Sequence, residues 1–130
     1  PEDELFPACE EMDVAVIARV PFDEGSLTGT MAIDTTFPDG DFRNVYFSPD
    51  KLGPIIEHVE ALEPIVPADS NMPELALRFI LSDNRVSTII PGMRKAAHVD
   101  ANMAASDLGP LTAEMINKLR VHRWERKAKP

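Results

Sequence analysis

Apolar and polar positions alternate along the chain in blocks that predict an α/β fold. Two short apolar runs rich in β-branched residues, Val14–Val20 and Val86–Ile90, are typical of strands buried on both faces of a parallel sheet. The first strand is expected over Asp13–Val20 and the second over Val86–Ile90. Between and after them, apolar residues recur every three or four positions, which indicates amphipathic helices. Two strands separated by a long helical crossover predict one βαβ unit with additional helices at each end.

Capping and breaking residues set the expected bounds of the helices. The clearest helix starts at Pro49 after the cap residue Ser48, runs to about Leu62 and is ended by Pro64–Pro67. Its inward-facing residues are expected to be Ile55, Ile56, Val59 and Leu62. The other expected helices are Leu5–Met12, Pro73–Ser82 capped by Ser70 or Asn71, Lys95–Ala105, and Thr112–Arg126 capped by Thr112.

A long irregular connection, Pro21–Ser48, separates the first strand from these helices. It contains Gly25, Gly29, Pro38 and Gly40 and shows no helical or strand period. A connection of this length inside a domain predicts a functional loop, such as a lid or a belt around a cofactor, rather than a plain linker.

The second strand is followed by features that favour anion binding. Pro91–Gly92 ends the strand, and a helix is expected to begin at about Lys95. The free N–H groups of its first turn and the positive end of its dipole would together form a site for an anion. Arg94 adds a planar charged group suited to bidentate phosphate recognition. His98 and Asn102 follow one and two turns later on the same helix face. This order of donors suits an adenosine phosphate.

The spacing Ile-Pro-Gly-x-Arg, with a polar residue six positions after the glycine and an asparagine ten positions after it, resembles the last βα unit of the aldo-keto reductase barrel. In that family the unit holds the 2′-phosphate and the adenine of NADPH. The resemblance implies that Gly92, Met93 and Arg94 face the 2′-phosphate. It also implies that Asn102 reaches the adenine, while His98 stands where the family usually has Gln. The alternative is an ordinary strand, turn and helix with a solvated Arg94.

A second motif follows the first strand. The segment Pro21–Gly29, Pro-Phe-Asp-Glu-Gly-Ser-Leu-Thr-Gly, resembles a loop of aldo-keto reductases with the pattern Pro-Leu-x-x-Gly-x-Leu-Thr-Gly. That loop follows the seventh barrel strand and wraps the cofactor pyrophosphate with backbone N–H groups. Glycine residues let a backbone approach a phosphate closely. The cofactor-binding residues that this resemblance implies are Pro21, Phe22, Gly25, Leu27 and Gly29.

The same loop departs from the family pattern in two ways. Arg19–Val20 replaces a frequent Tyr-Ser pair, and Asp23 and Glu24 place two negative charges beside the expected anion site. The hydroxyls of Ser26 and Thr28 offer further hydrogen-bond donors. Pyrophosphate binding at this loop therefore requires that the two carboxylates point to water.

The resemblance covers nearly the whole chain, because Met72–Leu81 is similar to the penultimate helix of the family and Leu111–Trp124 to its C-terminal helix. It implies that residues 1–130 are a single, incomplete domain from an aldo-keto reductase of bacterial type. The implied fold is α/β, a partial (β/α)8 TIM barrel with only the C-terminal βα units and a C-terminal helix. A complete barrel takes about 250 residues.

The catalytic Tyr, Asp, Lys and His of the family come from the first half of its barrel, so the resemblance implies that this chain holds no catalytic residue. Its only tyrosine, Tyr46, lies in the long connection, with no Lys or His suitably spaced to act with it. We therefore expect Tyr46 to be an aromatic packing residue.

Composition narrows the choice of function. The chain has 22 acidic and 13 basic residues and a net charge of -9, which argues against nucleic-acid binding. One cysteine, Cys9, excludes an internal disulfide and a cysteine-based zinc site. No signal peptide and no apolar run long enough to span a bilayer is evident, so we expect no membrane partner and a cytoplasmic location.

The three histidines, His58, His98 and His122, are too far apart in sequence to predict a metal site. His58 is expected on the outer face of its helix. The triplet His122-Arg123-Trp124 is expected to dock the last helix rather than to form a site.

The leading hypothesis is the cofactor-binding part of an NADPH-dependent aldo-keto reductase, which reduces a small carbonyl substrate by hydride transfer. One alternative is a non-catalytic, self-associating α/β module derived from the same fold, and another is a phosphate-binding α/β domain of a different barrel family. In the isolated chain the two strands would pair with each other and leave open sheet edges, so we expect it to form a homo-oligomer.

Overall fold

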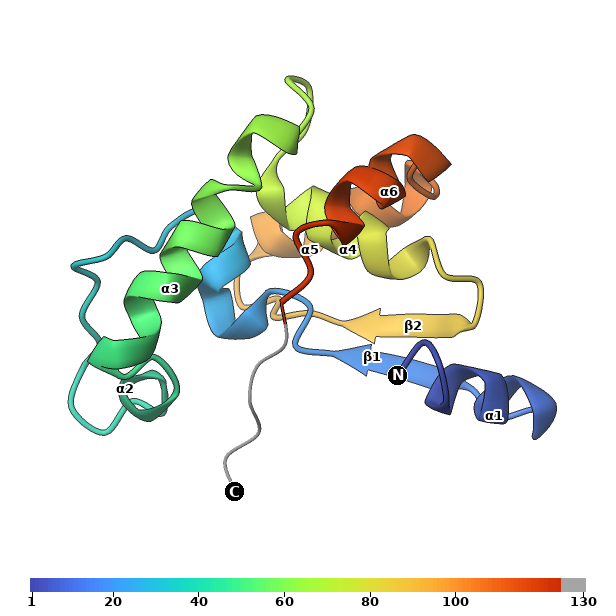
Figure 1. Ribbon diagram of the computed structural model, residues 1–130, viewed down its shortest axis with the longest axis horizontal. Helices are drawn as coiled ribbons and strands as arrows, with labels where there is room; N and C mark the ends of the chain where they lie inside the picture. The colour runs from blue at the N-terminus through green and yellow to red at the C-terminus, as the bar shows by residue number, and fades with distance from the viewer. Residues whose placement is uncertain (125–130) are drawn as a thin grey trace.

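The two predicted strands pair in parallel in the computed structural model, which describes residues 1–124 (Figure 1). β1 (Val16–Arg19) and β2 (Val86–Ile90) form a two-stranded sheet. Arg19 lies opposite Ile90, so the carboxyl ends of both strands meet at one edge of the sheet. The parallel βαβ unit expected from the sequence is therefore confirmed.

Helices fill the crossover between the strands and flank them on either side. α1 (Leu5–Glu11) precedes β1, whereas α5 (Ala96–Asp107) and α6 (Ala113–Arg120) follow β2. The crossover contains, in order, η1 (Asp23–Thr28), α2 (Arg43–Tyr46), α3 (Pro49–Glu60), η2 (Glu63–Ile65) and α4 (Met72–Leu81). Among residues 1–124, no helix has the length and apolar character needed to cross a bilayer.

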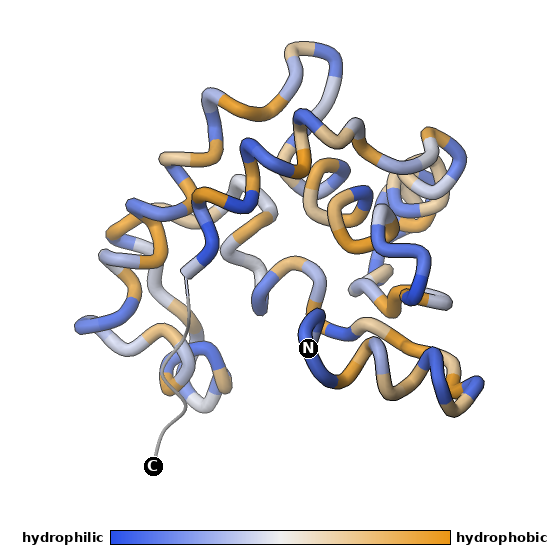
Figure 2. The backbone as a smooth tube through the Cα atoms, turned by 45° about the vertical axis from the view of Figure 1, so that its right-hand side comes forward, coloured by the Kyte–Doolittle hydropathy of each residue, from blue (hydrophilic) through white to orange (hydrophobic). Residues whose placement is uncertain are grey.

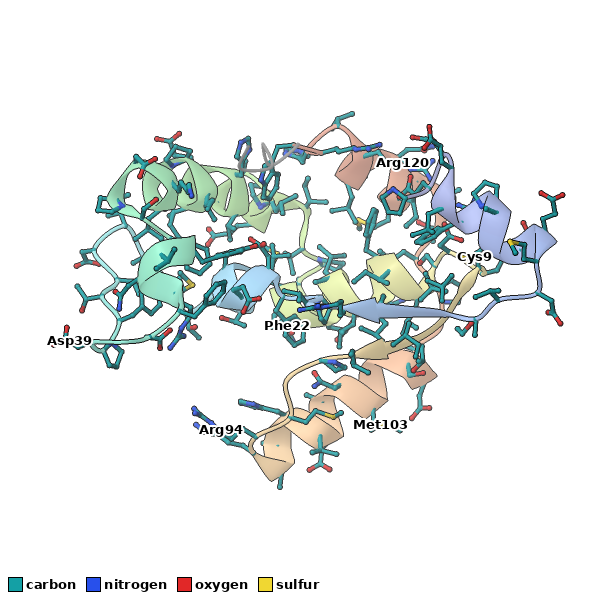
Figure 3. The ribbon with its side chains drawn as sticks, turned by 90° about the horizontal axis from the view of Figure 1, so that it is seen from below. Cys9, Phe22, Asp39, Arg94, Met103 and Arg120 are labelled. Carbon is teal, nitrogen blue, oxygen red and sulfur yellow. The ribbon has the colours of Figure 1, made fainter. Side chains whose placement is uncertain are left out.

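α4 connects the sheet to the other helices. It packs against β2, α5 and η1, whereas α3 packs against η1 and η2. Seen from below, α5 and α6 lie on opposite sides of α4 (Figure 3). The loop that follows β1 is therefore held between the two longest elements of the crossover, α3 and α4.

The hydrophobic core lies around α3. The buried cluster consists of Phe47, Leu52, Ile55, Ile56, Val59, Leu62 and Met72. It includes all four residues predicted to face inward from the helix that starts at Pro49, so this prediction is confirmed. Burial of one aliphatic side chain of this kind contributes about 1.5–3 kcal/mol. Figure 2 shows the corresponding alternation of polar and apolar segments along the helical turns.

Two of the predicted helix caps form as expected. The side-chain oxygen of Asn71 accepts a hydrogen bond from the Glu74 N–H at 3.0 Å, and the Thr112 hydroxyl oxygen accepts one from the Met115 N–H at 3.2 Å. Each bond satisfies an N–H of a first helical turn that has no partner within the helix. Ser48 occupies the position before α3, but its side chain makes no capping hydrogen bond.

The first strand is shorter than predicted at both ends. We expected a strand over Asp13–Val20, and the observed strand is Val16–Arg19. Asp13 and Val20 have φ angles of 53° and 56°, in the left-handed region that a strand does not use. The conformation of Val20 is strained, because a β-branched side chain is crowded at positive φ.

The connection Pro21–Ser48 is not wholly irregular, contrary to the prediction, because it contains η1 and α2. The turn at η1 has no hydrophobic period that would reveal it. It is built on left-handed φ angles of 50° at Asp23 and 55° at Glu24, which residues other than glycine rarely adopt. The other predicted helices agree with the structure to within about two residues, with one exception.

The exception is the C-terminal helix, which was predicted over Thr112–Arg126. α6 ends at Arg120, and the last predicted residues, 125 and 126, lie outside the described part of the chain. After this helix the chain turns, and Trp124 stacks on His58 of α3 with ring centroids 4.4 Å apart. This contact agrees with the expected docking role of the His122-Arg123-Trp124 triplet.

The strands are not buried on both faces, which corrects the interpretation of their apolar sequences. Ile17 of β1 and Ile90 of β2 share one face of the sheet, and their exposed fractions are 60% and 59%. Ala18 and Ile89 on the opposite face are half-buried. Within residues 1–124 each strand has a single strand neighbour, and helical packing leaves the other face open.

Candidate functional site

The two predicted cofactor motifs lie side by side. Because β1 and β2 run parallel and Arg19 lies opposite Ile90, the loop that starts at Pro21 and the turn at Gly92 leave the same edge of the sheet. Figure 3 shows the Phe22 and Arg94 side chains beyond this edge. In α/β proteins, ligands bind at the carboxyl ends of parallel strands, so the motifs occupy the edge where a shared ligand would be expected.

The turn after β2 is open to solvent. Gly92, Met93 and Arg94 are all exposed. A Cβ placed on Gly92 would have no atom within 4 Å, and the residue has no left-handed φ, so the fold of this chain does not require a glycine there. The space beside Gly92 is therefore free for close approach of a ligand to the backbone.

α5 presents its N-terminus beside this turn. The helix begins at Ala96, after Lys95, whose side chain makes no capping hydrogen bond, and its first turn carries no acidic residue. Among residues 1–124, Arg94 makes no hydrogen bond or ion pair, so its guanidinium is available to an anion. The helix dipole and two adjacent cations give this end of α5 a positive potential.

The other two predicted residues lie further along α5. His98 is exposed. The Asn102 amide Nδ2 lies 3.4 Å from the Gly92 carbonyl oxygen, to which it donates a hydrogen bond. Asn102 thereby links the helix to the turn, while its side-chain oxygen remains available as an acceptor. Arg94, His98 and Asn102 therefore form one continuous strip from the turn along the helix.

The loop after β1 is closed by its own hydrogen bonds. The N–H groups of Asp23, Gly25 and Leu27 donate to carbonyl oxygens of Val20 and Phe22, at 3.0, 2.9 and 3.2 Å. Pro21 is buried, Phe22 and Leu27 are half-buried, and Gly29 is exposed with a left-handed φ of 70°. The predicted pyrophosphate loop is thus an ordered turn rather than an extended belt.

Side chains inside the loop do not act as expected from the sequence. The Ser26 hydroxyl donates to Asp23 Oδ2 at 2.6 Å, and the Thr28 hydroxyl donates to the Gly25 carbonyl oxygen at 2.6 Å. Ser26 is only 1% exposed. The two hydroxyls proposed as phosphate donors therefore serve the turn itself, because a strained backbone needs these bonds to hold its shape.

The two carboxylates of the loop are held in different ways. Asp23 is turned toward Tyr46, whose hydroxyl donates to Asp23 Oδ1 at 2.8 Å. Glu24 lies near Arg43, and its charge is one of the smaller contributions that raise the pKa of that guanidinium, after the hydrogen bonds to Asp41. Asp23 therefore does not point to water, as the sequence interpretation required of both carboxylates, because its two oxygens are bonded within the chain.

Tyr46 packs as predicted and has a further role that sequence patterns missed. Its ring makes an edge contact with Phe47 at a centroid distance of 4.9 Å and a tilted contact with Phe42 at 5.6 Å. Its hydroxyl reaches Asp23, which is 23 positions away in sequence. The spacing Asp23-x-x-Ser26 signals a local side-chain turn, but nothing in the sequence signals the partner of Tyr46.

An ion pair fixes the far end of the long connection. Arg43 donates from Nε and Nη2 to the Asp41 carboxylate at 3.0 and 2.7 Å, and its guanidinium lies 4.5 Å from the ring centroid of Phe37. The side-chain hydrogen bonds from Arg43 lower the pKa of Asp41 to about 2. Asp41 therefore stays ionised at a lower pH than an ordinary aspartate does.

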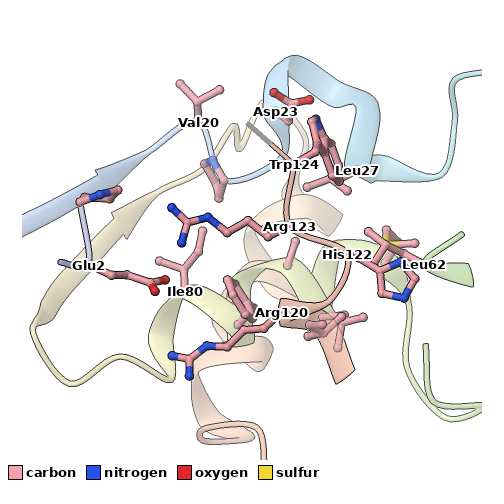
Figure 4. A pocket seen from close by; sticks show the side chains of 17 residues that line it. Glu2, Val20, Asp23, Leu27, Leu62, Ile80, Arg120, His122, Arg123 and Trp124 are labelled. Carbon is pink, nitrogen blue, oxygen red and sulfur yellow. The ribbon is translucent and has the colours of Figure 1, made fainter. Parts of the chain in front are cut away.

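A cavity of about 610 Å³ lies on the other side of α4 from Arg94 (Figure 4). Val20 and Asp23 stand at one side of it and Arg120 at the other, and most of its wall is apolar. Pro21 and Leu27 of the first motif line it, but no residue of the second motif does. This cavity therefore is not where a ligand could contact both motifs.

Residues 1–124 contain no group of three or more His, Cys, Asp or Glu side chains arranged to hold a metal ion. The groups at the sheet edge that could contact an anion are the Gly92 backbone, Arg94 and the N-terminus of α5.

Comparison with known families gives a match over almost the entire chain. The model described as Aldo/keto reductase family matches residues 1–123. Among curated proteins, the NADH-specific methylglyoxal reductase of Escherichia coli is 28% identical over 108 residues, covering 82% of this chain and 33% of that protein. The aldo-keto reductase yakc [NADP(+)] of Schizosaccharomyces pombe is 28% identical over 108 residues, covering 81% of this chain and 32% of that protein.

Solved structures give the same result. The glycerol dehydrogenase AKR11B4 from Gluconobacter oxydans superimposes with a TM-score of 0.78 at 25% identity, covering 93% of this chain and 37% of that one. The holo form of the aldo-keto reductase AKR11C1 from Bacillus halodurans has a TM-score of 0.63 at 28% identity, covering 92% and 36%. The chain spans about a third of the length of the curated relatives it matches.

Proposed function

Because this chain belongs to the aldo/keto reductase family, we propose that it is the cofactor-binding part of an NADPH-dependent oxidoreductase that reduces a small carbonyl substrate. Its two parallel strands would be the last two strands of a (β/α)8 barrel. The catalytic acid and its partners would come from sequence outside these 130 residues.

The observation that carries this proposal is the shared position of the two motifs. Gly92 leaves open space for a phosphate, Arg94 has no partner among residues 1–124, and the α5 N-terminus points to the same turn. The Pro21–Gly29 loop leaves the neighbouring strand at the same edge. An elongated dinucleotide can reach both motifs, whereas a single small anion would need only one.

In this proposal each predicted site residue contacts a particular part of the dinucleotide. Gly92, Met93 and Arg94 would hold the 2′-phosphate, and His98 and Asn102 would extend the contact along α5 to the adenosine. Pro21, Phe22, Gly25, Leu27 and Gly29 would shape the surface against the pyrophosphate. The bound nicotinamide would supply the hydride, and this chain's residues would bind and orient the cofactor.

Arg94 favours NADPH over NADH as the cofactor. A guanidinium pairs strongly with a phosphate, and only NADPH carries one at the 2′ position. The relatives differ in this respect, since one is named as NADH-specific and another as using NADP(+). The guanidinium of Arg94 beside Gly92, unpaired among residues 1–124, is what supports NADPH in the proposal for this chain.

A cofactor titration tests the proposed function. Fluorescence or calorimetry with NADPH and NADH would be carried out on the full-length enzyme and on the 130-residue chain. We expect the full-length protein to bind NADPH more tightly than NADH, and the shorter chain to bind more weakly. Absence of dinucleotide binding by the full-length protein would contradict the proposal.

The exposed face of the sheet favours one alternative, a self-associating module without catalysis. Ile17 and Ile90 place apolar surface on a face that no helix covers within residues 1–124. This alternative predicts a stable oligomer that binds no dinucleotide. The titration above distinguishes the two hypotheses.

A further inference from the structure

The loop that carries the first cofactor motif is strained. Three residues other than glycine, Val20, Asp23 and Glu24, have φ angles of 56°, 50° and 55° within a stretch of five positions. Such conformations persist only where the surroundings hold them in place, and they often occur at ligand-binding sites. The contacts that hold this loop therefore bear on its function.

Asp23 is the point at which the loop is held. Its two carboxylate oxygens accept hydrogen bonds from different parts of the chain, Oδ2 from Ser26 at 2.6 Å and Oδ1 from Tyr46 at 2.8 Å. The first bond closes the turn on itself. The second ties the turn to α2, the short helix that precedes the core residue Phe47.

Tyr46 is itself firmly placed. Its ring is half-buried against Phe47 and Phe42, and it packs on the core cluster around α3. A hydroxyl on a rigid ring fixes a carboxylate more precisely than a flexible side chain does, because fewer rotamers are lost when the bond forms. Among the described residues, Tyr46 thus connects the core to the strained loop.

The geometry points to Tyr46 as a positioning residue for cofactor binding. Its hydroxyl, together with that of Ser26, fixes Asp23 and so holds the Pro21–Gly29 loop in the shape that meets the cofactor pyrophosphate. The same bonds keep the Asp23 charge turned toward Tyr46, which reduces its repulsion of the pyrophosphate. This inference rests on the proposed function, since it concerns the same site.

NADPH and NADH both contain the pyrophosphate, whereas only NADPH has the 2′-phosphate. The proposed roles of Tyr46 and Arg94 therefore predict different effects on the binding of the two dinucleotides. Loss of the Tyr46 hydroxyl is expected to weaken NADPH and NADH binding by the same factor. Loss of Arg94 is expected to weaken NADPH binding alone. The two residues therefore give different signatures in one titration.

The test compares Tyr46→Phe with the wild type in the full-length enzyme. Phe retains the ring and its contacts but removes the donor to Asp23. We expect the Kd values of both dinucleotides to rise about three- to tenfold, while kcat at saturating cofactor stays within about twofold. Ser26→Ala, which removes the other donor, is expected to change both Kd values in the same direction.

Thr35→Val is the matched control. The Thr35 hydroxyl accepts a hydrogen bond from the Ala32 N–H at 2.7 Å in the same long connection but outside the motif. This variant loses a local bond without touching Asp23, so its melting temperature is expected to fall while both Kd values stay unchanged. If Tyr46→Phe does not fold, Ser26→Ala decides the question against the same control.

The outcomes separate the inference from the function on which it rests. Unchanged Kd values in Tyr46→Phe, with a lowered melting temperature, would show that the Tyr46 hydroxyl is only structural. A Kd increase confined to NADPH would also overturn the inference, because the pyrophosphate is shared. If the wild-type enzyme binds neither dinucleotide, the proposed function itself fails.

Discussion

Arg19 of β1 and Ile90 of β2 lie opposite each other in the parallel sheet, and this pairing sets the distance between the two motifs that follow them. Both strands end at these residues. The Pro21–Gly29 loop and the turn at Gly92 therefore start from neighbouring points, although about seventy residues separate them in the sequence.

Replacing Arg94 by alanine in the full-length enzyme is expected to weaken NADPH binding by about 1.5–3 kcal/mol, the usual contribution of a charge-assisted hydrogen bond. NADH binding should hardly change, because NADH has no 2′-phosphate. Titration of both cofactors measures the difference. Equal losses for the two cofactors would mean that Arg94 has a structural role instead.

Gly92→Ala provides a test that does not alter charge. The substituted methyl group meets no atom of the chain within 4 Å, so the melting temperature is expected to stay within about a degree of the wild-type value. NADPH affinity should nevertheless fall, because the methyl group enters the space left for the phosphate. A variant that binds NADPH as well as the wild type would show that no ligand approaches this backbone.

The 130-residue chain alone is expected to show no carbonyl reductase activity. The Tyr46 hydroxyl donates to Asp23, and no Lys or His lies at a spacing that would serve it as a catalytic partner. The check is an assay with NADPH and a reactive aldehyde. Turnover that survives further purification, and that Tyr46→Phe abolishes at saturating NADPH, would place the active site in this chain.

The exposed strand face predicts the assembly state of the isolated chain. Open sheet edges and apolar surface around Ile17 and Ile90 favour association, so we expect an oligomer by light scattering coupled to size exclusion. Ile17→Lys should shift the population toward monomer. Val121→Lys, at a residue 80% exposed on the end of α6, is the matched control and should leave the mass unchanged.

A monomer at micromolar concentration with a cooperative melt would contradict that prediction. It would show that the isolated chain stays monomeric although the sheet face with Ile17 and Ile90 is exposed. The intermolecular contacts of an oligomer are expected at the strands or at the Pro21–Ser48 connection.

The ion pair between Asp41 and Arg43 predicts a dependence of stability on pH. The folded-state pKa of Asp41 is lowered to about 2 from 3.8, so its stabilisation is fully present above about pH 4 and is lost as the pH falls toward 2. Asp41→Asn should therefore lower the melting temperature near neutral pH. The difference from the wild type should shrink between pH 4 and pH 2.

Melting curves across this pH range measure the effect. Asp39→Asn removes a neighbouring carboxylate that makes no ion pair with Arg43, and it should lower the melting temperature less at every pH. A difference between Asp41→Asn and the wild type that stays constant down to pH 2 would contradict the assignment.

The sequence predicted structure correctly where one residue type favours one local backbone arrangement, such as a helix cap. Asn71 and Thr112 cap their helices as predicted, and Val86–Ile90 is a strand over its predicted length. These features depend on neighbours within a few positions. The inward face of α3 was equally predictable, because its apolar period matches the helical repeat.

The features that sequence patterns missed depend on contacts distant in sequence or on unusual backbone angles. The bond from Tyr46 to Asp23 spans 23 positions, and the left-handed Val20 ends β1 despite a sequence that favours a strand. The apolar run of Val14–Val20 predicted burial on both faces. An apolar pattern shows which side chains are stabilised by burial, but it does not show whether this chain contains the helices or strands that would bury them.

The pairing of β1 with β2 also has a consequence for the order in which the chain is expected to fold. The Val16 N–H donates to the Ser87 hydroxyl across 71 positions, so a very large loop must close before the sheet can form. The packing of α3 and its neighbouring turns involves much shorter separations and should form sooner. We therefore expect the sheet edge that brings the two motifs together to assemble late, so that a slowly maturing preparation would gain the proposed cofactor affinity after it gains helix content.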